Sequence, residues 1–234
     1  MKSIWKRFQY YGIGFLIGMI FVGFFFQNRG CAWMPSNRVK NTFLDKVIVL
    51  PDSEKEKFER QRISTDEIIG FLNDGDVVFR ESVKQPAVFP KAYVLERKLR
   101  GKKHRVQFSL YEDSYITPVH YLEEGEEAQV YESLKGEGSF IRLPRDSALV
   151  FIENSNYVRC KAQGLKDRSQ EAIVTALKNS GRIHFDRSNL MLPKAEHRIY
   201  FEQVPQDTVE AKTIWFESRI TFKDFYWKEP LDCE

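Results

Sequence analysis

The sequence lacks a complete catalytic signature and has few of the residues that usually build one. It contains three cysteines and four histidines. No two cysteines form a CxxC motif, and no histidine lies near them at metal-ligand spacing. We therefore predict no catalytic residue, no cofactor and no metal site. Ser82 and Ser188 follow similar strands, but neither belongs to a Gly-x-Ser-x-Gly elbow, so a turn-capping hydroxyl is the favoured interpretation over a nucleophile.

The sequence also has no large excess of basic over acidic residues. The chain has 36 basic and 33 acidic residues and a formal net charge of +3. Such a balance does not suggest a nucleic-acid partner, and we expect none. The densest basic group is a weak candidate patch for phosphates, with a solvated hairpin as the alternative. It comprises Arg97, Lys98, Arg100, Lys102, Lys103 and Arg105.

The histidines offer little chemistry in the sequence alone. His104 follows two lysines at an expected hairpin tip, which indicates a surface position. His120 lies near the end of an expected strand, where packing or exposure is favoured. His184 lies between Ile183 and Phe185, so its side chain should point to the solvent-exposed face of a strand.

One long stretch carries no charge at all. Residues Phe8 to Gln27 read FQYYGIGFLIGMIFVGFFFQ. As a helix they would cover about 30 Å, the thickness of the hydrocarbon core of a bilayer. We therefore predict a transmembrane helix over residues 8–27, with the lipid bilayer as its partner. The alternatives are a cleaved signal peptide, a lipoprotein acylated at Cys31, and a buried soluble helix.

The charges around this stretch suggest an orientation. Lys2, Lys6 and Arg7 precede it, and basic residues also follow it, so the positive-inside rule is nearly balanced. The tighter first cluster favours a cytoplasmic N-terminus over residues 1–7, an inner-membrane location and periplasmic globular domains. Gly14 and Gly18 form a GxxxG pattern that could support self-association, and a helix facing lipid on all sides is the alternative.

The predicted compartment gives the cysteines a possible role. In an oxidising periplasm Cys160 and Cys233 could form a disulfide, and Cys31 could cross-link two chains. Three unpaired thiols are the alternative, because the sequence cannot show that the Cα atoms are close together.

The rest of the chain is predicted to fold as a tether and two similar α+β domains. The tether covers residues 28–45, the first domain 46–122, a linker 123–148 and the second domain 149–234. In each domain a short helix precedes a meander of antiparallel strands. The first helix begins near Ser64 and ends at Gly75, which we expect to be a left-handed cap.

An internal duplication supports this division. Gly75-Asp76-Val77-Val78-Phe79-Arg80-Glu81-Ser82 aligns with Gly181-Arg182-Ile183-His184-Phe185-Asp186-Arg187-Ser188, and Pro90-Lys91-Ala92 recurs as Pro193-Lys194-Ala195. A period near 100 residues indicates two domains and not a solenoid.

This order of a short helix, an Asn/Asp-Gly turn, a Val-x-Phe strand and a meander resembles a bacterial domain of unknown function. The resemblance covers residues 46–122 and 149–228. Tandem copies behind an N-terminal anchor are similar to uncharacterised envelope proteins of the Bacteroidetes type. The resemblance implies a fold distantly similar to RelE- and MqsR-type toxins.

Two functions follow as hypotheses. The first is a single-pass, non-enzymatic scaffold or protein-interaction protein of the bacterial envelope with an unidentified protein partner. The alternative is a divergent RelE-like ribonuclease tethered to the cytoplasmic face of the membrane. A third possibility is a lipid-headgroup binder that uses the basic patch.

Overall fold

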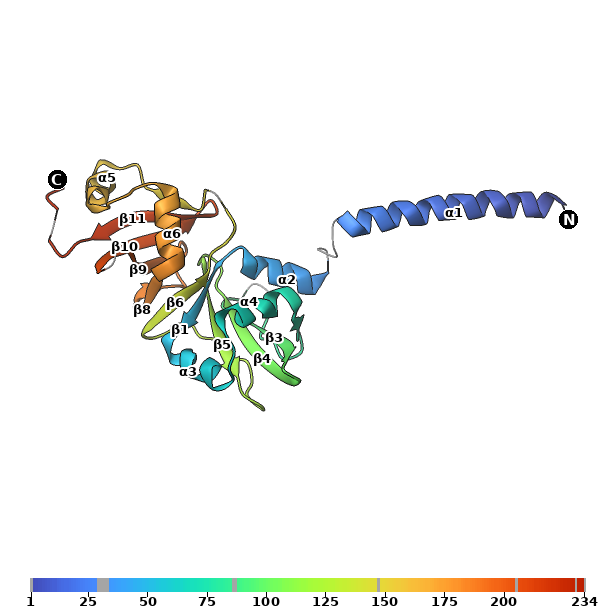
Figure 1. The fold of residues 1–234 in the computed structure, drawn as a ribbon, viewed down its shortest axis with the longest axis horizontal. Coiled ribbons are helices and arrows are strands. Elements are labelled where there is room, and N and C mark those ends of the chain that lie inside the picture. Colours follow the sequence, from blue (N-terminus) through green and yellow to red (C-terminus); the bar gives the residue numbers. More distant parts are fainter. Residues whose placement is uncertain are drawn as a thin grey trace. The chain divides into compact units, whose positions relative to one another are not determined.

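The structure is a computed structural model, and it places most of the chain in defined elements (Figure 1). It divides into a unit of residues 1–39 and a unit of residues 40–234, which are described separately. Within the first helix it describes the side chains of residues 10–23. The described residues are 2–28, 34–85, 88–146, 148–204, 206–229 and 231–233.

The first unit contains the helix α1 (Lys2–Asn28). Its described side chains, residues 10–23, are all exposed. Among the residues that the structure describes, no helix is both long enough and apolar enough to span a membrane. The predicted transmembrane helix is therefore wrong, and the single-pass inner-membrane location and the two membrane-tethered functions are corrected with it.

The remaining helices are short and lie between the strands or before them. They are α2 (Pro35–Leu44), α3 (Asp52–Arg60), α4 (Thr65–Asp74), α5 (Asn156–Lys161), the 3₁₀ turn η1 (Ala162–Gly164) and α6 (Gln170–Ser180). Pro35, which lies in the expected tether, is the first residue of α2, a position where its missing N–H costs nothing.

Eleven strands form one mixed sheet in the order β2-β3-β4-β5-β1-β6-β8-β9-β10-β11-β7. In chain order they are β1 (Val47–Pro51), β2 (Asp76–Val77), β3 (Lys91–Leu99), β4 (Lys102–Leu110), β5 (Ile116–Leu122), β6 (Glu137–Arg142), β7 (Val150–Ile152), β8 (Arg182–Asn189), β9 (Glu196–Val204), β10 (Asp207–Phe216) and β11 (Arg219–Tyr226).

The sheet is built from two halves with the same topology. In the first half β1 pairs in parallel with β5, the last strand of an antiparallel meander. In the second half β7 pairs in parallel with β11 in the same way. The strand β6 joins the halves, because it pairs with β1 on one side and with β8 on the other. The predicted α+β class holds, but the prediction of two separate small domains is wrong, since residues 137–142 of the expected linker complete a single sheet.

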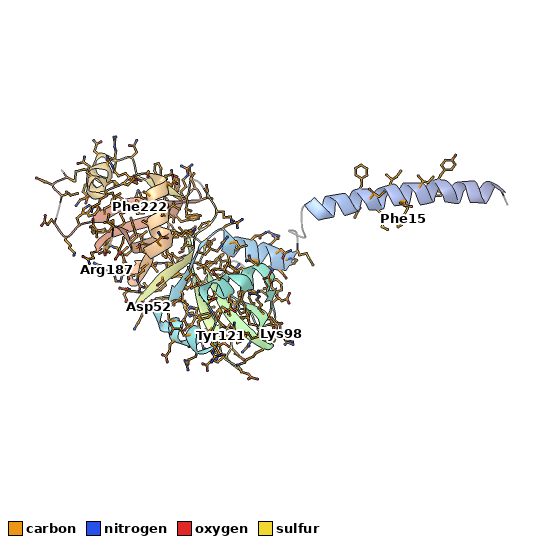
Figure 2. All side chains as sticks on the ribbon, in the orientation of Figure 1. Phe15, Asp52, Lys98, Tyr121, Arg187 and Phe222 are labelled. Atoms are coloured by element: carbon orange, nitrogen blue, oxygen red, sulfur yellow. A yellow bond between two sulfur atoms is a disulfide. The ribbon has the colours of Figure 1, made fainter. Side chains whose placement is uncertain are left out.

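The hydrophobic core is also shared between the halves. Val47, Val49 and Tyr115 belong to the same buried cluster as Ile183 and Phe201. In Figure 2 the labelled side chains mark the two halves, with Lys98 and Tyr121 in the first and Arg187 and Phe222 in the second. A continuous core explains why the halves form one compact unit.

Two equivalent glycines end the helices α4 and α6, but not as left-handed caps. Gly75 and Gly181 have extended backbone conformations, with φ of −78° and −62°. An added Cβ would approach the carbonyl oxygen of Phe71 to 2.4 Å and that of Leu177 to 2.2 Å. The requirement for glycine is therefore close backbone packing, and the expected left-handed cap at Gly75 is corrected.

Candidate functional site

The structure pairs most of the charges of the predicted basic patch with carboxylates of the first half. Arg97 packs over Gly70 of α4, whereas Lys103 and Glu96 form an ion pair on the neighbouring strands β3 and β4. Lys102 donates to Gln61, and Lys98 is exposed. The carboxylate pairs are Arg97–Asp74 at 2.9 Å, Arg100–Glu67 at 2.6 Å, Lys103–Glu96 at 2.7 Å and Arg105–Glu81 at 3.0 Å. These cations act mainly as local ion-pair partners within the first half.

The structure tests the predictions for His104 and for the pairing of Cys160 with Cys233. His104 is buried and contacts the hydroxyl of Tyr121 at 3.1 Å, so the expected surface position is wrong. Cys160 and Cys233 are joined by a disulfide with their Cα atoms 5.8 Å apart. Cys31 lies outside the described residues. Added Cβ atoms at Gly14 and Gly18 meet nothing within 4 Å, and self-association through them stays a prediction.

Sequence reasoning missed a buried polar cluster where the two halves meet. Ser114, which precedes β5, lies 2.7 Å from the Nε2 atom of His197 on β9. The hydroxyl of Ser114 also accepts a bond from the backbone N–H of Ile116, and Lys46 donates to the carbonyl groups of Tyr111 and Ser114. Ser114 is 0% exposed and His197 is 1% exposed. A serine and histidine enclosed in this way join the halves and cannot receive a substrate.

Burial also sets the charge state of this cluster. It lowers the pKa of His197 to about 3, and the nearby charge of Lys46 acts in the same direction. It lowers the pKa of Lys46 to about 8, which the carboxylate of Asp113 partly opposes. His197 is therefore a neutral imidazole at neutral pH.

Equivalent hydrogen bonds fix the alignment of the two halves. Ser82 donates to the carbonyl group of Val78 and accepts from the N–H of Val94, at 2.8 and 3.0 Å. Ser188 donates to His184 and accepts from Arg198 in the same pattern, at 2.6 and 2.9 Å. Both hydroxyl groups therefore bond to backbone groups of their own half, Ser82 in a bend and Ser188 near the end of β8.

A charge-reversed ion pair extends this equivalence across the sheet. Glu81 pairs with Arg105 in the first half, and Arg187 pairs with Glu210 at 2.8 Å in the second. The strand registers agree, since Arg105 lies opposite Glu96 and Glu210 lies opposite Tyr200. Two residues further along, on the same face of each strand, Gln107 of β4 therefore corresponds to Lys212 of β10.

In the first half this polar sheet face is covered by the chain itself. We call residues 123–131 the covering segment. Gln107 makes two bonds to the backbone of Gln129, one from its Nε2 to the carbonyl group at 2.7 Å and one from the backbone N–H to its Oε1 at 2.9 Å. Arg105 donates to the carbonyl group of Glu123 at 2.5 Å. Tyr111 donates to the carbonyl group of Tyr131 at 2.6 Å. All of these bonds are made to backbone groups of the covering segment, and none of them to its side chains.

In the second half the equivalent face is accessible to solvent. We call it the open face, and it is centred on Arg198, Tyr200, Glu210, Lys212 and Tyr226. The side chain of Lys212 is 33% exposed, whereas its equivalent Gln107 is 1% exposed. The side chain of Arg198 is 20% exposed, whereas its equivalent Val94 is fully buried. At both positions the side chain of the first half is less exposed to solvent than its equivalent on the open face.

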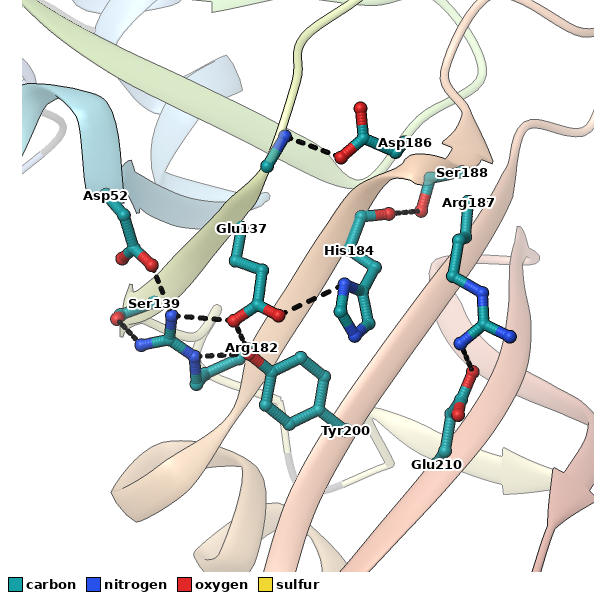
Figure 3. A network of polar contacts seen from close by, with 11 residues as sticks. Asp52, Glu137, Ser139, Arg182, His184, Asp186, Arg187, Ser188, Tyr200 and Glu210 are labelled. Atoms are coloured by element: carbon teal, nitrogen blue, oxygen red, sulfur yellow. Dashed lines mark hydrogen bonds and ion pairs between the residues drawn. The ribbon is translucent and has the colours of Figure 1, made fainter.

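A network of polar contacts borders the open face (Figure 3). Arg182 contacts Asp52 at 2.5 Å, Ser139 at 2.8 Å and Glu137 at 3.0 Å. The hydroxyl of Tyr200 donates to Glu137, and His184 lies 3.2 Å from the same carboxylate. These bonds, with that from Tyr200 foremost, lower the pKa of Glu137. A carboxylate that is stabilised as an anion by several donors is a weak proton acceptor. The network is therefore better suited to fixing the positions of Arg182 and Tyr200 than to transferring protons.

The segment after β11 takes another path from the segment after β5. Trp227 donates from its indole to the carbonyl group of Lys161 at 2.9 Å, and its ring lies against Gly164. The disulfide then ties Cys233 to α5, and Figure 1 shows the C-terminal end beside that helix. Trp227 and Cys233, which follow β11 as the covering segment follows β5, are therefore held against η1 and α5.

In the part of the chain that the structure describes, no group of three His, Cys, Asp or Glu side chains could hold a metal ion. Comparison of the chain with models of protein families, with curated proteins and with solved structures finds no match. The resemblance to a RelE-like domain family therefore stays a prediction.

Proposed function

We propose that the open face binds an extended segment of polypeptide from a partner. One observation carries the proposal: the equivalent face of the first half is covered by a peptide that belongs to no helix or strand, and that peptide is the chain's own covering segment. Two faces of one topology share strand registers and side-chain positions. A face that binds the backbone of a peptide in one copy provides a scaffold for the same kind of ligand in the other.

The side chains of the open face suit this role. Arg198 places its guanidinium 3.8 Å from the ring centroid of Tyr226, which holds both groups in place. Lys212 stands where Gln107 binds the covering segment, and its ammonium can donate to peptide carbonyl groups. Tyr200 offers a flat aromatic surface beside them. Donors and rings that are already ordered lose little conformational entropy when a ligand binds.

The charge balance of the face favours recognition of the peptide backbone. Arg198 and Arg187 share the carboxylate of Glu210, and Lys212 pairs with Glu196 at 2.7 Å. Ligands of strong net charge would gain little from a face whose three cations are each paired with one of two carboxylates. Backbone carbonyl groups, in contrast, can accept the remaining N–H bonds of the arginine and lysine side chains.

Selection from a phage-displayed library of random nonapeptides tests the proposal. We expect the full chain to enrich peptides that bind the Arg198→Ala/Lys212→Ala variant at least tenfold more weakly, by fluorescence polarisation of the synthetic peptides. Arg168→Ala, a change at an exposed residue before α6, is the matched control and should leave the affinity unchanged. Failure to enrich any peptide, or equal binding to the double variant and the control, would overturn the proposal.

A further inference from the structure

A cavity of about 410 Å³ lies between the end of β6, the loop that follows it, and the helix α6. Its apolar wall includes Phe140, Leu143 and Val174. Ligand-binding cavities commonly measure about 300–1,000 Å³ and combine apolar walls with a few polar groups. The cavity therefore has a suitable size for a small organic molecule.

Three cations line this cavity: Arg142, Arg145 and Lys178. Asp146 is the one acidic residue in its described lining, and its carboxylate accepts a bond from the backbone N–H of Ala148. The formal charge of the lining is thus +2.

Arg142 is the innermost of the three cations. It is partly buried and donates to the carbonyl group of Leu44 at 2.7 Å, which leaves most of its N–H groups for other acceptors. Burial lowers the pKa of Arg142 and the charge of Arg145 adds to this effect, while Asp45 opposes it. Two like charges in a partly apolar setting repel each other, and an anion between them would remove that cost.

The cavity differs in this respect from the larger groove beside the predicted basic patch. That groove measures about 600 Å³ and is lined by Lys102, Lys103 and Arg105. Lys103 and Arg105 already pair with carboxylates at 2.7 and 3.0 Å, and Glu123 and Glu124 also line the groove. Its cations have partners within the chain and leave little net attraction for an anion.

We propose that the cavity beside α6 binds a small carboxylate that carries an apolar body. The carboxylate would lie between Arg142 and Arg145, since a guanidinium group can bind both oxygens of a carboxylate in one plane. Lys178 would add a third positive charge at the rim, and the apolar body would pack on Phe140 and Val174. The site is separate from the open face and does not depend on peptide binding there.

Isothermal titration of the full chain with 1-naphthoate tests this site. We expect saturable binding with one ligand per chain, and at least tenfold weaker binding of the neutral 1-naphthamide. Arg145→Gln should weaken naphthoate binding at least tenfold, and Arg145→Lys should weaken it by less than Arg145→Gln, because the charge remains while the planar pair of N–H donors is lost. Arg168→Gln, which removes an exposed charge elsewhere, is the control. Urea unfolding of each variant shows whether it is folded.

Three outcomes would overturn the proposal. Naphthoate could fail to bind at millimolar concentration, naphthamide could bind as well as naphthoate, or Arg145→Gln could bind naphthoate as well as the Arg168→Gln control does. Val174→Trp gives an independent check, because a large ring in the wall should exclude the naphthyl group while all three cations stay in place.

Discussion

At the scale of single residues, burial and partners decide what the polar side chains do. His104 follows two lysines in the sequence, and yet its ring is buried beside Tyr121. His197 and Ser114 are far apart in the chain and meet in the core. Neither contact has a local sequence pattern, since the partners are 17 and 83 residues apart. The backbone bonds of Ser82 and Ser188 were predictable because a serine hydroxyl often bonds to nearby backbone.

The buried His197 should make stability fall in weak acid. Its pKa in the folded protein is lowered to about 3, against an ordinary value of 6.5, so between these values the unfolded chain binds a proton that the folded chain does not. The stabilisation is present above pH 6.5 and is lost as the pH falls. Each pH unit in this window costs about 1.4 kcal/mol. Between pH 6.5 and pH 5 we expect a loss of about 2 kcal/mol from this residue.

Urea unfolding of the wild type and His197→Gln at several pH values measures this effect. Glutamine keeps a polar side chain near Ser114 and does not titrate. Carboxylates contribute equally to both proteins, so the difference between the two curves isolates the histidine. The wild type should lose about 2 kcal/mol more than the variant between pH 6.5 and 5. Parallel curves for the two proteins would contradict the assignment of a neutral buried imidazole.

At the scale of elements, local patterns predicted the helices and strands better than their pairing. The helix α4 begins at the predicted cap, where Ser64 and Glu67 form a capping box. Val106 and Phe108 alternate with polar residues, which is the period of a half-buried strand, and β4 does lie there, but Gln107 is buried on its other face as well. In contrast, β6 was assigned to a turn-rich linker, because its pairing with β1 and β8 depends on residues far away in the chain.

The covering segment gives a prediction at this scale. Gln107→Ala would remove the two partly buried hydrogen bonds that hold the backbone N–H and carbonyl group of Gln129. We expect a loss of about 1–3 kcal/mol in the free energy of unfolding. Hydrogen exchange in residues 126–131 should become faster by at least tenfold, because these residues would detach more often.

The duplicated half supplies the matched control for this change. Lys212→Ala alters the equivalent position on the open face, where the described chain makes no equivalent bond to a covering peptide. This variant should change stability by less than about 0.5 kcal/mol and leave exchange in residues 126–131 as it is. If both variants had the same effect, the covering segment would not be held by Gln107, and the comparison of a covered with an open face would lose its support.

At the scale of the whole molecule, the duplication explains both the fold and its asymmetry. The aligned glycines, serines and strands of the two halves were visible in the sequence. That the halves share one sheet and one core was not visible, because a period of about 100 residues describes separate and fused repeats equally well. The asymmetry lies in the chain segments that leave β5 and β11, and the second of these is fixed by Trp227 and a disulfide.

The disulfide between Cys160 and Cys233 should contribute strongly to the stability of the second half. It links residues 73 positions apart, and closing a loop of this length restricts the unfolded chain by roughly 4 kcal/mol in the chain-entropy account. We expect Cys160→Ser/Cys233→Ser to lower the free energy of unfolding by about 2–4 kcal/mol. The slope of that free energy against urea concentration should rise, because an unfolded chain without the link exposes more surface.

Cys31→Ser is the control for this double variant, and it should unfold like the wild type. Hydrogen exchange should show where the loss falls. Without the disulfide we expect faster exchange in residues 226–233, while β3 and β4 keep their protection. Equal stability of the double variant and the wild type in the absence of reductant would show that the link does not form in solution. The different paths of the two segments would then depend on Trp227 alone, and Trp227→Ala should expose the same residues.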